Sequence, residues 1–317
     1  MGRKRMRGTG VEELGLRSWL AANVRPFPLT GEATVAVPEV LARAEVVGLA
    51  SAVRSARESV LATGVLLRGL VAEAGFRAVF IEGTEETGPA LDRYVRTGEG
   101  DLRALVRASQ SFLRTTDAED VLRGIRSWNR SHPDDPVSLV SVQRPIEGDS
   151  LAGIEAALAD TVLTWRAETG QRIVHWGGIA HLVVGDPRRI PPNHVGRSAG
   201  GALRARLGPG YAVAAFTTGC GAAPFPVPAP QPDFLESVFE GLPAGGDEGL
   251  LLDLHRAAEH APDTVARWLR RPLRTRMIGP VYDPGRDQDF RVEAGPLADS
   301  LDAVVHLPRL TPTTPVT

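Results

Sequence analysis

The first residues with the types and spacing for chemistry lie in the stretch LASAVRSARE, residues 49–58. It carries, in chain order, Ser51, Arg54, Ser55, Arg57 and Glu58. Hydroxyl and guanidinium groups bind carboxylates and phosphates, whereas arginine stays protonated at any ordinary pH. At the start of a helix they add to the positive end of its dipole. The stretch therefore predicts an anion-binding corner, and it offers no histidine for proton transfer.

Candidate proton-transfer groups stand elsewhere. Glu82 ends an apolar run, and ligands of open α/β sheets bind beyond the carboxyl ends of the strands. His181 follows another apolar run, where a cleft position is expected, although a histidine bonded into the core is the alternative. We predict Glu82 and His181 as the catalytic residues. His175 lies inside that second run, where a structural role or a place in the cleft lining is open to it.

Metal and cofactor sites are not predicted. Cys220 is the single cysteine of the sequence, and the seven histidines show no H-E-x-x-H or comparable spacing. We interpret Cys220 as a small buried residue rather than a nucleophile, because no base lies near it in the sequence. The expected site has no metal and no cofactor.

Composition limits the partners. A net charge of −2 over 317 residues argues against a nucleic-acid surface, which needs a concentrated basic excess. No apolar run approaches the ~20 residues of a membrane span, and the basic start MGRKRMRG is not followed by a continuous apolar segment. We therefore expect a cytoplasmic protein without a membrane or nucleic-acid partner, a monomer that binds a small molecule.

Alternating strand and helix patterns predict the fold. Short β-branched runs recur at 44–49, 77–82, 136–142, 172–176, 211–216 and 302–307. A helical pattern between them runs from a cap at Ser150 to a stop at Gly170, and Thr116 with Glu119 has capping-box spacing. This order is typical of an α/β protein with a mainly parallel sheet flanked by helices.

The chain is expected to form one domain, residues 1–317. Two regions without an obvious strand, about 84–135 and 232–275, are predicted to be helical insertions that wall a cleft above the strand ends. The proline-rich stretch 221–234 is interpreted as an extended connector.

In this order the segments resemble the erythromycin esterase family over nearly the whole chain. The run VVGL at 46–49, the later glutamate and the strand that ends in Ile81 and Glu82 are similar to its first strand, turn and helix. DRYVRTGEGDLRAL at 92–105 is similar to its Y-V-x-x-G-x-G-D segment, and RIVHWGGIAH at 172–181 to its W-A-H-N-x-H. The resemblance implies the fold of that family and a metal-free hydrolytic site.

The departures from the family pattern fall on that site. Ser51 stands where the family turn G-E-A-T-H-G has its glutamate, and Arg54 where it has its histidine. In the later motif Trp176 and His181 remain, whereas Gly177 and Gly178 replace alanine and histidine. An aspartate of the third strand corresponds to Gln143 here. The resemblance thus implies that the hydrolytic general base is missing, since arginine cannot accept a proton.

Two functions fit these observations. The first is a natural-product tailoring enzyme that performs a cyclisation, elimination, isomerisation or altered hydrolysis. Its predicted substrate-binding residues are Ser51, Arg54, Ser55, Arg57, Glu58, Gln143, His175 and Trp176. The second is a pseudoenzyme that binds such a molecule without turnover. A further alternative concerns the arginines alone, because Arg54 and Arg57 can pair internally with Glu58 and Glu82 rather than with a ligand.

Overall fold

The computed structural model describes residues 3–30, 33–141, 150–259 and 261–317. Within these, the largest sheet has the strand order β1-β10-β13-β8-β2-β5-β3-β4, with β9 paired to β8. Its parallel strands are β2 (Val46–Ser51), β3 (Ala78–Ile81), β4 (Ser138–Val140), β5 (Ile173–Gly178), β8 (Tyr211–Ala222) and β13 (Ala303–Leu310). Antiparallel strands at one edge are β1 (Arg25–Pro28) and β10 (Glu248–Asp253), and β9 is Pro226–Val227.

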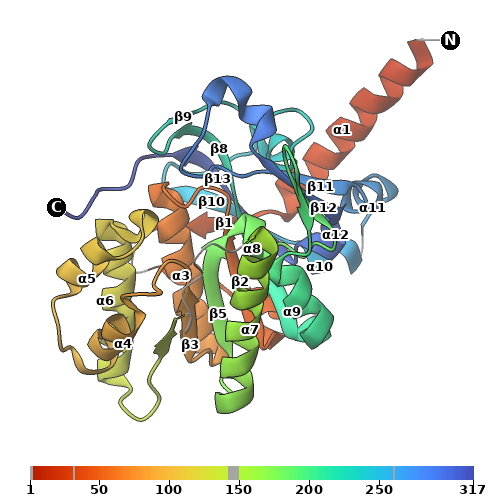
Figure 1. Cartoon of the computed structure of the whole chain (residues 1–317). Helices are drawn as coiled ribbons and strands as arrows, with labels where there is room; N and C mark the ends of the chain where they lie inside the picture. Colours follow the sequence, from red (N-terminus) through yellow and green to blue (C-terminus); the bar gives the residue numbers. More distant parts are fainter. Residues whose placement is uncertain (1–2, 31–32, 142–149, 260) are drawn as a thin grey trace.

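Helices flank this sheet, as Figure 1 shows. One group on the left comprises α3 (Arg57–Ala74), α4 (Gly88–Thr97), α5 (Leu102–Ala108) and α6 (Thr116–Ser131). Another lies across the front and right, with α7 (Leu151–Thr169), α8 (Ile179–Leu182) and α9 (Ala199–Leu207). The remaining helices are α1 (Arg3–Asn23), which extends away from the body, α2 (Glu39–Arg43), α10 (Leu254–Glu259), α11 (Asp263–Leu269) and α12 (Leu297–Ser300).

A second, four-stranded sheet has the order β11-β12-β6-β7. Its strands are β11 (Pro272–Arg276), β12 (Arg291–Pro296), β6 (Arg188–Ile190) and β7 (His194–Gly196). Arg276 ties it to the main sheet, because its buried guanidinium pairs with Asp287 at 2.9 Å and donates to the carbonyls of Thr218 and Gly219 in β8. Short 3-10 turns complete the described chain at Ser111–Leu113, Gly208–Gly210, Leu235–Phe239 and Pro284–Asp289.

The parallel strands explain the position of the site. Every residue of β2, β3 and β5 is buried, which accounts for their continuous apolar runs. In register, Ser51 at the end of β2 lies beside Gly178 of β5, and Ile81 of β3 lies beside Trp176. The carboxyl ends of these three strands therefore meet at one edge. The predicted α/β fold with a mainly parallel sheet is confirmed.

One of the two predicted helix caps is confirmed, and the other is shifted by one residue. The Ser150 hydroxyl accepts from the Gly153 amide, and Gly170 ends the helix in the left-handed region, both as predicted. The predicted cap at Thr116 was wrong by one residue. Thr115 has the extended backbone and accepts from the Ala118 amide, so Thr116 is already helical.

Two other predictions need correction. Residues 232–275 are not a purely helical insertion, because β10 lies within them and pairs with β13 and β1 of the main sheet, and β11 begins at Pro272. Cys220 is exposed rather than buried. It lies near the far end of β8, where the strand's burial stops after nine residues. Residues 84–135, in contrast, hold α4, α5 and α6.

Candidate functional site

Glu82 is the centre of the candidate site. It follows β3 directly, and the residue is only 5% exposed. Its Oε2 accepts a hydrogen bond from Arg54 Nη1 at 2.9 Å and another from the Gly178 amide at 3.1 Å. Its Oε1 lies 3.2 Å from His175 Nε2, although the two atoms are not aligned for a hydrogen bond. The carboxylate therefore joins the turn after β2 to the end of β5.

Gly177 makes this position possible. His175 and Gly177 lie two residues apart on β5 and so face the same side of the sheet, the side that Glu82 covers. A Cβ atom on Gly177 would lie 1.9 Å from Glu82 Oε1, closer than any real contact. At Gly178 the nearest atoms to such a Cβ are 3.6 Å away, which is ordinary contact. A side chain at 177 would therefore displace the Glu82 carboxylate from this position.

The charge of Glu82 follows from its neighbours. Burial alone raises the pKa of a carboxyl group, but the charge of His181, the contact with His175 and the charge of Arg54 outweigh it. Together they lower the pKa of Glu82 to about 2. Glu82 is therefore a fixed carboxylate at any physiological pH. In this state it holds the Arg54 guanidinium, and its part in proton transfer stays a prediction.

Arg54 forms an internal ion pair, which was one of the two alternatives that the sequence left open for it. It bridges to Glu82, and its guanidinium lies over the Phe112 ring, 4.2 Å from the centroid. Its side chain remains 29% exposed. Since a guanidinium carries five donor hydrogens, the pair with Glu82 leaves donors for a ligand oxygen. The internal ion pair and ligand binding are compatible at this residue.

His181 forms a second centre beside the first. Its Nδ1 lies 3.0 Å from Glu155 Oε1 of α7, and the same oxygen accepts from Arg188 Nη1 at 2.7 Å. Oε2 of Glu155 accepts from the Ala199 amide at 2.7 Å. Three elements thus fix this carboxylate, which in turn orients the imidazole. The ring lies deep among its neighbours yet keeps 19% of its side chain exposed.

The pKa of His181 reflects both carboxylates. Burial lowers the pKa of a histidine, but the charge of Glu82 and the hydrogen bond to Glu155 act in the opposite direction and prevail, so the pKa of His181 is raised. With Nδ1 engaged by Glu155, Nε2 is the ring nitrogen left to exchange a proton with a ligand. The pair has the geometry of a histidine oriented by an acid.

Glu155 and Arg188 were not predicted from the sequence, and each lies almost fully buried. A signal for Glu155 was present. It stands between Ile154 and Leu158 of the amphipathic helix, so it is an acid on the face that packs inward. Arg188 gave no local signal, because it reaches the site through the short strand β6.

The other predicted residues have separate partners. Arg57 pairs with Asp117 at 3.2 Å and not with Glu58 or Glu82. Glu58 accepts from the amide of Thr311, which anchors the C-terminal segment. The Ser55 hydroxyl donates to the Ala223 carbonyl at 2.8 Å. These three side chains tie the turn to the rest of the fold.

Three predicted lining residues lie inside the sheet: Ser51, His175 and Trp176 are buried at the ends of β2 and β5. His175 contacts Glu82 and the Phe80 ring, in keeping with a structural role. Gln143 lies outside the described residues. Over the described ranges, no group of three His, Cys, Asp or Glu side chains is arranged to hold a metal ion. None of the helices described there is long and apolar enough to cross a membrane.

Comparisons with known proteins show the family and the fold of the chain. The sequence profile of the erythromycin esterase family matches residues 71–143 and 147–310, which is most of the chain. The chain therefore belongs to the erythromycin esterase family. No curated protein matches it significantly in sequence.

Three solved structures share the fold. A Bacillus cereus protein has a TM-score of 0.78 at 14% identity, covering 95% of this chain and 98% of that one. A protein described as a succinoglycan biosynthesis protein has a TM-score of 0.77 at 14% identity, with the same coverage. A mutant of the erythromycin esterase EreC in its open conformation has a TM-score of 0.65 at 15% identity, covering 93% of this chain and 99% of its own. At these identities the likeness establishes the fold alone.

The lack of room for a side chain at Gly177 leads to the first prediction. Gly177→Ala should lower the free energy of unfolding by about 1–3 kcal/mol, because its methyl group displaces the Glu82 carboxylate. Gly178→Ala is the matched control and should cost less than about 1 kcal/mol, since its methyl group meets ordinary contacts. Neither glycine has a positive φ, so space alone separates them. Urea denaturation of both variants measures the difference, and equal losses would contradict the assigned position of Glu82.

A second prediction concerns the charge of His181. Glu82→Gln should lower the pKa of His181, since a charge that raises it is removed. The raised pKa also means that the contribution of His181 to stability is full below its unfolded pKa of about 6.5 and is lost as the pH rises through its folded pKa. NMR titration of the imidazole checks the first effect. Unfolding of wild type and His181→Gln at rising pH checks the second, and a stability difference that grows with pH would contradict it.

Proposed function

We propose that this chain is a natural-product tailoring enzyme in which His181 transfers the proton. The reaction class is a cyclisation, elimination, isomerisation or altered hydrolysis of a polyketide-like or peptide-like small molecule. One observation carries the proposal: a partly exposed histidine, oriented by the buried carboxylate of Glu155, stands beside the Arg54 and Glu82 ion pair at the carboxyl ends of the strands.

The charges support a proposed role for each group. Because the pKa of His181 is raised, its protonated form persists to a higher pH than in an ordinary histidine, and that form can give a proton to a leaving or developing oxygen. Glu82 favours that protonated form, since its own pKa is about 2 and it stays negative. The free donors of Arg54 can hold a substrate carboxylate or stabilise an oxyanion. The site is thus suited to general acid catalysis on an oxygen-bearing substrate.

Ester hydrolysis in the manner expected of the family does not suit this site. The sequence resemblance puts Arg54 at the position of the family histidine, and a guanidinium cannot take a proton from water. Gly178 stands at the position of a second one and provides no side chain. A biosynthetic role is consistent with one structural neighbour, which is named as a succinoglycan biosynthesis protein, although the shared feature with that protein is the fold.

The alternative function is binding without turnover. The observation that favours it is the ion pair between Arg54 and Glu82, because a carboxylate held in that pair with a lowered pKa is suited to binding rather than to proton transfer. In such a protein Arg54 would anchor the ligand and His181 would add a hydrogen bond. The two functions differ in what happens to the bound molecule, and that difference can be measured.

The test is turnover of a panel of macrolactones, linear polyketide esters and cyclic peptides, followed by mass spectrometry. We expect wild type to convert at least one compound, and His181→Gln to lower kcat/KM by about 100-fold or more, the usual contribution of a general acid. His255→Gln is the matched control. It removes a histidine that also faces a carboxylate, Asp302 at 2.7 Å, but on α10 outside the site.

The outcomes separate the two functions. Conversion that is lost in His181→Gln and retained in His255→Gln supports the enzyme. A compound that raises the melting temperature of wild type and is recovered unchanged supports the binding protein instead. Conversion that survives His181→Gln would remove this histidine from the mechanism.

A further inference from the structure

Arg54 and His181 converge on one point of the candidate site. A Cβ atom built on Gly178 would have Cζ and Nε of Arg54 at 3.6 Å and Cδ2 of His181 at 3.7 Å. These are the three nearest heavy atoms outside residues 177–179. In the imidazole ring Cδ2 is bonded to Nε2, the nitrogen that the contact with Glu155 leaves free. Because residue 178 has no side chain, one small group beyond it is within reach of both the guanidinium and the imidazole.

Three contacts fix the Arg54 guanidinium. Its Nη1 donates to Glu82, its Cζ lies 4.2 Å from the centroid of the Phe112 ring, and it lies at ordinary contact distance from the side-chain position of Gly178. Phe112 is itself closely packed, since a Cβ atom on Gly83 would be 3.0 Å from its ring. A guanidinium has five donor hydrogens, so the bond to Glu82 leaves others for a ligand. The side chain is partly exposed, which lets a ligand reach it from solvent.

The charges around His181 balance until its imidazole takes up a proton. Among the described side chains of this group, Arg54 pairs with Glu82 and Arg188 pairs with Glu155, so each guanidinium is matched by one carboxylate. Both carboxylates favour a proton on the imidazole, and that proton leaves one positive charge without a counter-ion. A ligand with a single negative charge restores the balance. A phosphate monoester carries a charge of about −1.5 to −2 at neutral pH and exceeds it.

Other titratable groups on the elements packed around the imidazole have partners of their own. His175 of β5 contacts the Glu82 carboxylate from within the sheet. On β8, Tyr211 donates its hydroxyl to a backbone carbonyl of α8 at 2.6 Å, and burial raises its pKa, so it stays neutral. On α9, Arg204 pairs with Asp302 at 2.6 Å. These groups leave the charge balance of the site unchanged.

We propose that Arg54 and His181 together bind a carboxylate group of the substrate. One carboxylate oxygen accepts from a free donor of Arg54, and the other accepts from the Nε2–H of the imidazolium. Such a group carries the single negative charge that the site lacks and forms charge-assisted hydrogen bonds with both donors. The inference rests on the proposed function, because the oxygen at Nε2 is the one that receives the His181 proton. That transfer leaves a neutral imidazole and a carboxylic acid.

Binding and protonation are linked at this subsite. A carboxylate favours the imidazolium form, so a bound carboxylate raises the pKa of His181 further. By reciprocity, its affinity is full below that pKa and falls as the pH rises through it. Arg54 stays charged over the same range, so the pH dependence reports on the imidazole.

The experiment titrates the full chain with propionate, propionamide and methyl phosphate in chloride-free buffer of constant ionic strength, with the His181 imidazole followed by NMR. We expect propionate to bind with a Kd of about 10 mM or below, and at least about fivefold more tightly than the other two probes. Saturating propionate should raise the pKa of His181 by about 0.5 unit or more. Its Kd should be at least about threefold higher above that pKa than below it.

Three variants complete the design. Gly178→Ala places a methyl group at the point of convergence, where it meets ordinary contacts, and should weaken propionate binding at least about fivefold in a folded protein. His181→Gln cannot be protonated at Nε2 and should remove the pH dependence of binding. Gly124→Ala is the matched control, a glycine of α6 whose Cβ atom would meet open space, and it should leave propionate binding unchanged.

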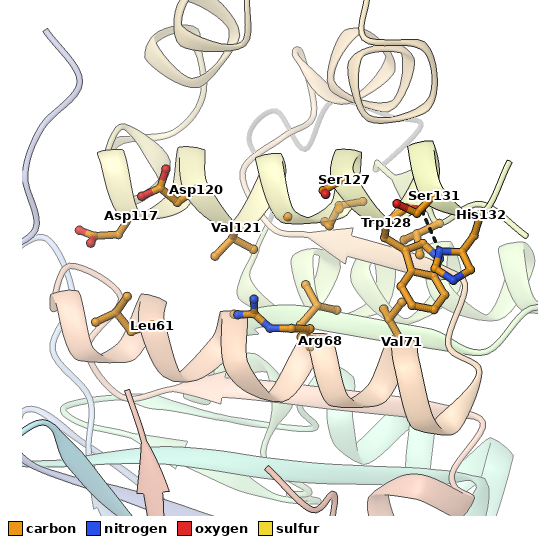
Figure 2. Close-up of a pocket in the computed structure, with 15 residues that line it drawn as sticks. Leu61, Arg68, Val71, Asp117, Asp120, Val121, Ser127, Trp128, Ser131 and His132 are labelled. Carbon is orange, nitrogen blue, oxygen red and sulfur yellow. Dashed lines mark hydrogen bonds between the residues drawn. The ribbon is translucent and has the colours of Figure 1, made fainter. Parts of the chain in front are cut away.

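The control also covers another place where a small probe could bind. Gly124 lines a pocket of about 430 Å³ between α3 and α6, which Figure 2 shows. Neither Arg54 nor His181 belongs to the residues that line it. Propionate binding that is weakened by Gly124→Ala and not by Gly178→Ala would place the probe in that pocket and overturn the inference.

Further results would also overturn it. Propionate that does not bind wild type, or that binds Gly178→Ala equally well, would show that no carboxylate is held at this point. Propionamide or methyl phosphate that binds as tightly as propionate would reject the carboxylate class. A Kd that stays constant as the pH passes the pKa of His181 would exclude the imidazole from the subsite.

Failure of this inference can be told apart from failure of the proposed function. Conversion of the compound panel that is lost in His181→Gln, together with no binding of propionate, would overturn the carboxylate subsite alone. Propionate binding with the expected pH dependence, in a protein that converts none of the panel, would support the subsite and favour the binding protein over the enzyme.

Discussion

A buried carboxylate needs partners, and the site of this protein depends on how that need is met at Glu82. The residue emerges from β3 with almost no exposure, where an unpaired charge would be costly. Arg54, the Gly178 amide and His175 surround it from two neighbouring strands. The result is a fixed negative charge that raises the pKa of His181 and positions Arg54.

The residues that the sequence resemblance marked as departures from the family pattern lie together in the structure. Arg54 lies against Gly178, where a Cβ would be 3.6 Å from the Arg54 guanidinium. Gly177 leaves the space that the Glu82 carboxylate fills. The arginine, its carboxylate and the two glycines therefore form one packed group.

Local sequence patterns were enough to predict much of the fold. The six strands of the parallel sheet were predictable because strands covered on both faces are continuously apolar. β10 was not recognised, since GLLLD follows a glycine-rich loop and its partners, β1 and β13, lie far away in the sequence. The exposure of Cys220 depends on how far β8 extends past its neighbours, which its own residues do not indicate.

From the sequence, only those residues of the candidate site that follow a predicted strand could be located. Glu82 and His181 were found because they follow buried strands, and the register then brings those ends together. The charge of Glu82 could not be predicted, because its pKa depends on its burial and on His181, His175 and Arg54, which come from distant parts of the chain. Glu155 and Arg188 are contributed by α7 and β6, and no spacing in the sequence links either of them to His181.

The ionisation of Glu82 tests this account most directly. The side-chain carboxyl carbon of Glu82 can be followed by NMR in protein labelled with ¹³C-glutamate and assigned with Glu82→Gln. The account predicts that this carbon keeps its carboxylate shift down to about pH 4, where an ordinary glutamate is largely protonated. A titration midpoint at or above the usual value of about 4.3 would contradict it, because Arg54 would then not hold a permanent anion at the centre of the site.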